Sequence, residues 1–300
     1  MRIGLVVQLH GRPDGPNQPA WDSIHELAKT AEEVGFDMFV FEDVLLYRGE
    51  EHTDGCWESM AIAAALAAST EHISLGQSVI NSPYRSPTLL AAQATTLDEI
   101  SDGRYVLGIG AGNSDDYEDF GFPPDHRFSR FEEAIQIIHT LLHDGRVSFD
   151  GRFYEVGDAE IVLRGPSPNG PQINIAGAGP KMLRLAARYG DAWNWWAYDE
   201  TVEEMTTRLT PILETLEEAC RAEDRATSDL DRTLDLYSVT PPGFEPPDGR
   251  RPLSGSADEL SSTLLRIEEL GFSEVRCDLT DNSTEAVSAM KDVVDLVHSA

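Results

Sequence analysis

Residues 72–113 read H-I-S-L-G-Q-S-V-I-N-S-P-Y-R-S-P-T-L-L-A-A-Q-A-T-T-L-D-E-I-S-D-G-R-Y-V-L-G-I-G-A-G-N. The apolar run from Ile73 to Ile80 is typical of a buried parallel strand. Ser86-Pro87 suits the start of a helix, because serine caps free N–H groups and proline is tolerated in the first turn. We expect that helix to end near Gly103 and the run from Tyr105 to Ile109 to form a second strand. The stretch therefore predicts a β–α–β unit.

The same alternation of strand and helix patterns continues through the chain. The remaining strands are expected at residues 2–9, 37–43, 172–176, 191–197, 233–239 and 274–279. Helical patterns cover residues 21–34, 57–70, 130–143, 180–189, 202–225, 257–270 and 285–297. Strands that alternate with helices indicate an α/β protein with a parallel sheet, and eight strand–helix units indicate closure into a (β/α)8 TIM-type barrel. An open doubly wound sheet is the alternative.

The chain shows no interruption long enough to form a second domain. Residues 1–300 are therefore expected to form a single barrel domain. Insertions into the barrel are expected around residues 113–128, 144–170 and 240–255. The second of these is predicted to contain a small hairpin over residues 147–156, because Asp-Gly is a common hairpin turn.

Composition narrows the class of function. The chain has 53 acidic and 23 basic residues and a net charge of −30, with no basic face that would bind nucleic acid. No run reaches the roughly 18 apolar residues of a membrane span, and the N-terminus lacks a signal-peptide pattern, so a cytoplasmic protein is expected. Acidic residues occur throughout, which favours adaptation to high salt, as in a halophilic organism, over a merely soluble acidic protein.

The cysteines give no indication of a metal site. Cys56, Cys220 and Cys277 lie far apart and outside any CxxC spacing. They are expected to be buried thiols in a reducing compartment, and no metal is predicted.

Four motifs together resemble the luciferase-like monooxygenase superfamily. They are L-G-Q-S-V at 75–79, Arg85-x-Pro87, T-L-D-E-I-S-D-G-R at 96–104 and L-G-I-G-A-G at 107–112. The resemblance extends more loosely over nearly the whole chain. It implies the same barrel and either FMN or the deazaflavin coenzyme F-420 as cofactor. Relatives are often dimers through barrel helices, so it also implies a homodimer.

Within this superfamily, the chain resembles the coenzyme F-420-dependent oxidoreductase branch. The resemblance implies an enzyme that transfers a hydride between F-420 and a small organic substrate. An FMN-dependent monooxygenase is the nearest alternative. A non-catalytic flavin-binding barrel is a further alternative, because Val44 and Asn113 stand where relatives carry acid–base groups.

The clearest binding motif is Gly177-Ala178-Gly179-Pro180-Lys181, which runs from a predicted strand directly into a helix. Free backbone N–H groups and the positive end of the helix dipole favour an anion there. The resemblance implies that this segment binds the cofactor phosphate. Arg184 and Arg188 follow Lys181 on the same predicted helix face, where the alternative is a solvated face paired with local carboxylates.

Residues at the ends of the third and fourth strands are further cofactor candidates. The resemblance implies a non-proline cis peptide between Ser78 and Val79, forming a bulge against the deazaflavin ring. Ala111 and Gly112 are too small to block a ligand that approaches the backbone. Asn113 follows them, at a position where some relatives place a glutamate that acts as an acid.

Catalytic candidates lie where active sites of such barrels form, at the carboxyl ends of strands. Asp43 matches an acidic position of F-420 enzymes, which suggests a catalytic or cofactor-binding role. There a histidine commonly follows, whereas Val44 follows here, and this change with Asn113 argues against sugar-phosphate dehydrogenase chemistry. His10 is the other candidate for catalysis, as a proton donor, with His52 as a second possibility. Trp196 and Tyr198 are expected to line the substrate pocket.

Overall fold

The computed structural model describes residues 1–13, 19–49, 52–112 and 117–300. Eight parallel strands form its main sheet: β1 (Arg2–Val7), β3 (Met38–Phe41), β6 (Ser74–Gln77), β8 (Tyr105–Gly110), β11 (Gln172–Ala176), β12 (Ala192–Tyr198), β13 (Asp231–Val239) and β14 (Glu274–Leu279). The strand order is β11-β12-β13-β14-β1-β3-β6-β8, and β8 also pairs with β11. This pairing closes the sheet into a barrel and confirms the predicted fold.

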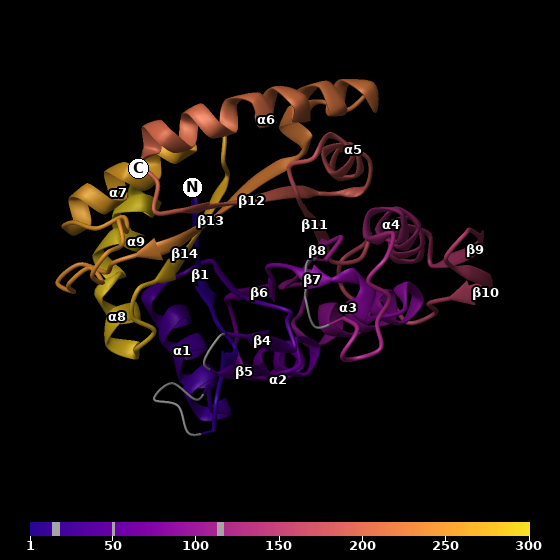
Figure 1. Cartoon of the computed structure of the whole chain (residues 1–300), viewed down its shortest axis with the longest axis horizontal. Helices are drawn as coiled ribbons and strands as arrows, with labels where there is room; N and C mark the ends of the chain where they lie inside the picture. Colours follow the sequence, from indigo (N-terminus) through magenta and orange to yellow (C-terminus); the bar gives the residue numbers. More distant parts are fainter. Residues whose placement is uncertain (14–18, 50–51, 113–116) are drawn as a thin grey trace.

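Nine helices are described, and Figure 1 shows them around the outside of the barrel. They are α1 (Trp21–Val34), α2 (Ser59–Ser69), α3 (Pro87–Ile100), α4 (Arg127–Asp144), α5 (Pro180–Tyr189), α6 (Val202–Ala222), α7 (Ala257–Glu268), α8 (Thr284–Ala289) and α9 (Lys291–Ser299). In α1 the buried residues recur at helical spacing, and Gly35 ends the helix in the left-handed conformation. Among the described residues, no helix has both the length and the apolar character needed to cross a membrane.

Two predicted elements are divided in the structure. The third strand, expected over residues 73–80, consists of β6 and the short strand β7 (Ile80–Asn81), which pairs with β8. The last helix, expected over residues 285–297, is interrupted at Met290, where α8 ends and α9 begins. Met290 is fully buried, so core packing at this bend competes with the continuous helical pattern of the sequence.

A second, smaller sheet forms where no strand is predicted from the sequence. Strands β2 (His10–Gly11), β4 (Leu46–Arg48) and β5 (Thr53–Cys56) form a small antiparallel sheet in the order β2-β5-β4. Strands this short carry too few residues to show an alternating pattern, which explains why the sequence does not predict them. The hairpin expected over residues 147–156 is confirmed as β9 (Arg146–Asp150) and β10 (Glu155–Glu160).

A charged side chain lies inside the barrel. Arg276 of β14 is 2% exposed, and its guanidinium contacts two carboxylates, Glu274 and Asp235. The Nη1 atom of Arg276 lies 3.6 Å from Oδ1 of Asp235, and its Nε donates to Glu274. A Cβ on Gly4 of β1 would lie 2.9 Å from Cγ of Arg276, so glycine at this position leaves room for the arginine.

We predict that Arg276→Met strongly destabilises the fold. The substitution keeps most of the side-chain volume but leaves Asp235 buried without its cation and Glu274 paired only with Arg2, and breaking such a buried pair typically costs about 3–5 kcal/mol. Chemical denaturation measures this loss of unfolding free energy. The matched control is Arg266→Met, because Arg266 forms a surface ion pair with Glu203 and its loss should cost at most about 1 kcal/mol. Equal effects of the two substitutions would contradict the prediction.

Candidate active site

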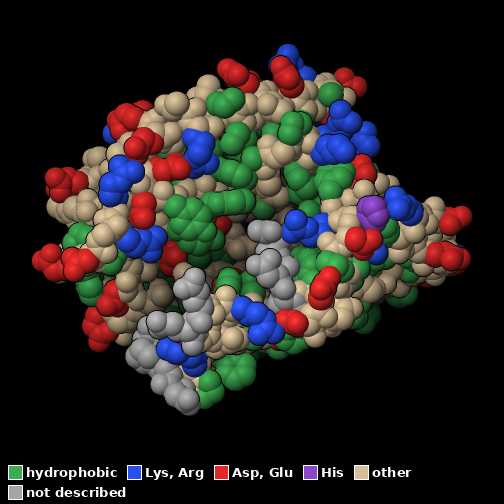
Figure 2. Space-filling view, viewed as in Figure 1, with side chains coloured by type: hydrophobic (Ala, Val, Ile, Leu, Met, Phe, Trp, Pro, Cys, Tyr) green, Lys and Arg blue, Asp and Glu red, His purple; other side chains and the backbone are tan. Residues whose placement is uncertain are grey.

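The predicted site residues gather at one end of the barrel. Asp43, Ser78, Gly112 and Gly177 follow the carboxyl ends of β3, β6, β8 and β11, and parallel strands place these ends on one rim. A cavity of about 270 Å³ opens there, and its lining includes His10, Glu42, Ser78, Val79, Tyr198 and Asp278. Figure 2 shows the molecule hollowed near the centre of the face in view.

The end of β6 has the backbone feature that the family resemblance implies. The peptide bond between Ser78 and Val79 is cis, which confirms that expectation. The Ser78 hydroxyl donates to the carboxylate of Asp235, which also accepts a hydrogen bond from Nδ2 of Asn194 at 3.0 Å. Burial raises the pKa of Asp235, and the Arg276 charge and the two hydrogen bonds oppose this shift. The rim at Ser78 is thus connected to the charged interior of the barrel.

The glycines within and after β8 are needed for packing within the protein itself. A Cβ on Gly108 would lie 1.9 Å from the carbonyl oxygen of Gln77. Gly112 has a φ of +81°, and a Cβ there would lie 1.8 Å from the hydroxyl of Tyr117. Cofactor binding by Ala111 and Gly112 stays a prediction, and Asn113 lies outside the described residues.

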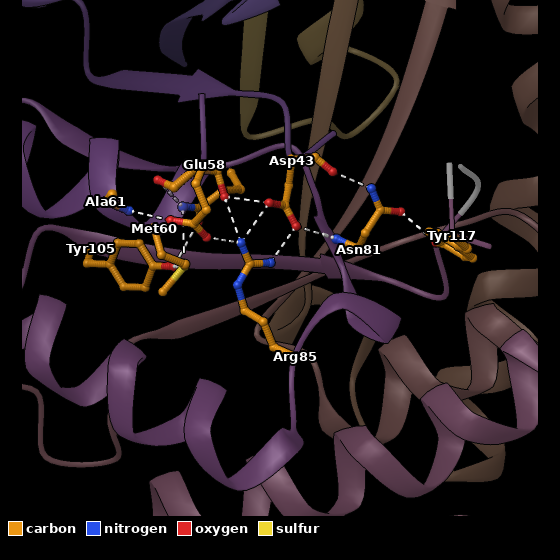
Figure 3. Close-up of polar contacts among 10 residues, drawn as sticks. Asp43, Glu58, Met60, Ala61, Asn81, Arg85, Tyr105 and Tyr117 are labelled. Atoms are coloured by element: carbon orange, nitrogen blue, oxygen red, sulfur yellow. Dashed lines mark hydrogen bonds and ion pairs between the residues drawn. The ribbon is translucent and has the colours of Figure 1, made fainter. Parts of the chain in front are cut away.

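Asp43 forms the centre of a buried ion-pair network (Figure 3). It is 2% exposed, and its two oxygens accept from Nη1 and Nη2 of Arg85 at 2.7 and 2.9 Å. Ser59 donates to it at 2.6 Å, and the backbone N–H of Asn81 donates at 2.9 Å. Arg85 also pairs with Glu58. Asp43 therefore ties the end of β3 to the segment after β7, and the catalytic and cofactor roles expected for it stay predictions.

Glu42, next to Asp43, organises a second cluster in the cavity. Its Oε1 accepts from the N–H of Leu9 at 2.8 Å and lies 2.9 Å from Nδ1 of His10. Its Oε2 accepts from the Tyr47 hydroxyl at 2.7 Å. The hydrogen bond to Glu42 is the main reason why the pKa of His10 is raised. The sequence predicts His10 as a candidate, but no local pattern pairs it with Glu42.

The same cluster contains donor atoms at the spacing of a metal site. Nδ1 of His10, a carboxylate oxygen of Glu42 and Sγ of Cys56 lie within 4.8 Å of one another. The hydrogen bonds that Glu42 accepts from His10 and Leu9 account for this convergence without a cation. His52, the other predicted proton donor, lies 3.5 Å from Asp54 and lines a neighbouring, larger cavity.

The predicted phosphate loop presents open backbone donors. Gly179 is the N-cap of α5, with a φ of −67°, and no side chain caps the helix. A Cβ on Gly179 would meet no described atom within 4 Å, whereas Gly177 has a φ of +133° and approaches Met182. The indole N–H of Trp193 donates to the carbonyl of Gly177 at 2.8 Å and fixes the loop. The loop therefore has the geometry that an anion requires.

The basic side chains on α5 differ in whether they are free to bind an anion. Nζ of Lys181 lies 5.2 Å from the centre of the Phe128 ring. Arg188 pairs with Glu223 at 2.8 Å, so its charge is used in a contact beyond the end of α6. This is the paired surface that the sequence left open as the alternative for Arg188.

The two predicted aromatic residues both lie near the rim. Tyr198 lines the cavity and stacks on Tyr237 at 4.5 Å between ring centroids. Trp196 is 38% exposed and stacks on Trp195 at 4.0 Å. Their role in substrate binding stays a prediction.

Asp278, at the end of β14, is a titratable group outside the set of catalytic candidates predicted from the sequence. It is 8% exposed and accepts a hydrogen bond from Nε2 of Gln8 at 3.2 Å. Burial is the main cause that raises its pKa to about 7. A carboxyl group that titrates near neutral pH thus lines the cavity.

Comparison with known proteins identifies the family. A family model described as luciferase-like monooxygenase matches residues 1–239, and the chain belongs to this family. An F-420-dependent glucose-6-phosphate dehydrogenase from Beutenbergia cavernae is 35% identical over 212 residues, which cover 69% of this chain. A 5,10-methylenetetrahydromethanopterin reductase from Archaeoglobus fulgidus is 36% identical over 163 residues, or 54% of this chain. These alignments span 60% and 46% of the two relatives.

The fold is also shared with a solved structure. An F-420-dependent secondary alcohol dehydrogenase in complex with an F-420-acetone adduct superposes with a TM-score of 0.79. The superposition covers 99% of this chain and 98% of that chain at 18% identity. The two proteins therefore share the barrel over their whole length.

We predict that Asp278→Asn stabilises the protein increasingly as the pH rises. The folded state holds this proton up to about pH 7, whereas an unfolded aspartate loses it near pH 3.8. The unfolding free energy of the parent therefore falls as the pH rises from 3.8 to about 7. The amide cannot ionise, and the variant should exceed the parent by about 1–4 kcal/mol at pH 8 and much less at pH 4. Denaturation curves over this pH range measure the difference. The exposed Asp248→Asn is the control, and a pH-independent difference for Asp278→Asn would contradict the prediction.

Proposed function

We propose that this protein is an oxidoreductase that transfers a hydride between coenzyme F-420 and a small organic substrate. The observation that carries the proposal is the uncapped N-terminus of α5, which lies on the same barrel rim as the cavity at Ser78 and Val79. Membership in the luciferase-like family and the two F-420-dependent proteins described above support it.

The described residues offer contacts for two parts of the cofactor, its phosphate and its ring. The first backbone hydrogen bond inside α5 runs from the N–H of Leu183 to the carbonyl of Gly179. The N–H groups of Lys181 and Met182 come before this bond and would bind the phosphate. Ser78 and Val79 would contact the ring from the cavity wall. The cofactor supplies or accepts the hydride when bound, and the residues of this chain orient the two reactants and exclude water.

The substrate we propose is not a sugar phosphate, although one relative is named a glucose-6-phosphate dehydrogenase. Val44 lines the cavity where the family pattern has a histidine. Among the described residues that line this cavity, Arg250 is the only lysine or arginine, and it pairs with Asp199 at 3.2 Å. The cavity thus offers a phosphorylated substrate little positive charge.

We predict that Gly179→Val abolishes measurable coenzyme binding in a folded protein. Valine is compatible with the extended backbone of Gly179, and its side chain would occupy the space in front of the free N–H groups. Lys181→Ala should weaken binding only about ten- to hundredfold, because the backbone donors remain. Fluorescence titration with F-420, and in parallel with FMN, measures both effects and separates the FMN-dependent alternative.

Gly157→Val is the matched control for this experiment, because a Cβ on Gly157 also meets no described atom within 4 Å. Circular dichroism confirms that each variant is folded. Parent-like binding by folded Gly179→Val would place the phosphate elsewhere.

We also propose adaptation to high salt, on the basis of the net charge of −30. Figure 2 shows acidic side chains spread over the face in view. Their mutual repulsion acts over about 30 Å at 0.01 M salt and about 3 Å at 1 M salt. We therefore expect the melting temperature to rise substantially between low and molar KCl. A flat or falling curve would reject this adaptation.

A further inference from the structure

His10 is held in one orientation by contacts from several sides. Its backbone in β2 pairs with Cys56 in β5, and its Nδ1 bonds to Glu42 at 2.9 Å. Its ring and that of Tyr47 pack edge to face, with 4.9 Å between centroids. Tyr47 in turn donates to the second oxygen of Glu42. One carboxylate thus fixes the imidazole and the ring that packs against it.

The second imidazole nitrogen, Nε2, is directed to neither of these partners. Within the described ranges, no group hydrogen-bonds Nε2 of His10. The side chain is 29% exposed and lines the cavity that also contains Ser78 and Val79. His10 also lines the larger neighbouring cavity, so its side chain borders both spaces, and Nε2 has no described protein partner that would compete with a ligand.

The charges around His10 favour its protonated form. Glu42 acts at hydrogen-bond distance, and Asp54 and Asp278 act at longer range in the same direction, while burial opposes them. Arg12 is engaged with Asp54 at 3.6 Å, and Cys56 and Tyr47 both contact Glu42. Because the pKa of His10 is raised in the fold, the imidazolium persists to higher pH than in a free histidine.

We propose that His10 is the acid–base group of the site, that Glu42 is its positioning residue, and that the substrate is an uncharged carbonyl compound or the corresponding alcohol. The proposal rests on the proposed hydride transfer. An imidazolium N–H suits an oxygen that becomes negative as a hydride reaches the adjacent carbon. The shortage of unpaired cations in the cavity favours an uncharged substrate over a phosphorylated or carboxylated one.

The step is balanced as follows in the reducing direction. The carbonyl carbon gains a hydride from the reduced deazaflavin coenzyme, which is thereby oxidised by two electrons. The C=O π bond breaks, and the oxygen takes the proton from Nε2 of His10. Oxidation of the coenzyme also releases the proton of one ring N–H to solvent, and solvent returns one proton to the neutral imidazole, so no net charge is left over. The reverse sequence oxidises the alcohol, with His10 as the base.

The test uses His10→Gln, Glu42→Gln and the control His72→Gln, since His72 is a highly exposed histidine outside the cavity. Without coenzyme, NMR titration should give His10 a pKa above 6.5 in the parent, and Glu42→Gln should lower it. Fluorescence titration should show that His10→Gln still binds F-420. The single-turnover rate constant for oxidation of reduced F-420 by acetone or cyclohexanone should then fall about 100- to 10,000-fold in His10→Gln.

The outcomes separate the two proposals. A parent protein that binds no F-420 overturns the proposed function itself. Normal F-420 binding with unchanged turnover in His10→Gln overturns the acid–base role of His10. A His10 pKa that Glu42→Gln leaves unchanged overturns the positioning role of Glu42. If the parent protein binds F-420 but neither ketone oxidises the reduced F-420 bound to it, the proposed substrate class is overturned.

Discussion

The buried charge of Arg276 is the constraint on which the barrel depends. A guanidinium inside a barrel is tolerated only when carboxylates compensate it, and Glu274 and Asp235 do so from β14 and β13. Gly4 of β1 supplies the space that the arginine needs. The Asp235 carboxylate then accepts hydrogen bonds from Ser78 and Asn194 at the rim. Packing in the interior and the geometry of the cavity are therefore parts of one network.

At the rim, two adjacent acidic residues perform different tasks. Successive residues at the end of a strand point in opposite directions, so Glu42 and Asp43 face different surroundings. Asp43 pairs with Arg85 and anchors the segment after β7. Glu42 faces the first strand and binds Leu9, His10 and Tyr47. The acidic residue suggested by family resemblance thus anchors the segment after β7, while its catalytic and cofactor roles stay predictions, and its neighbour bonds to the histidine of the cavity.

The departures from the family pattern have a consistent physical interpretation. Val44 leaves the end of the second barrel strand without an imidazole, and His10 brings one into the same cavity from the end of the first. The change of position alters what surrounds the imidazole, because Glu42 bonds to it, Asp278 acts on it at longer range, and the cavity's arginine is paired. A shared fold thus carries a cavity with its own electrostatics.

Local sequence patterns predict the eight barrel strands and their alternation with helices. Apolar periodicity, the Ser86-Pro87 helix start and the glycines before α5 act over a few residues, so β11, α5 and β14 were predicted with the bounds that the structure has. Tertiary structure decided the pairing of β2 with β5, the break at Met290 and the partners of Arg276 and His10. The bond between Gln8 and Asp278 joins residues 270 positions apart, and the raised pKa of Asp278 follows from burial. Such contacts depend on how distant strands meet when the barrel closes, and no local pattern of residues records that.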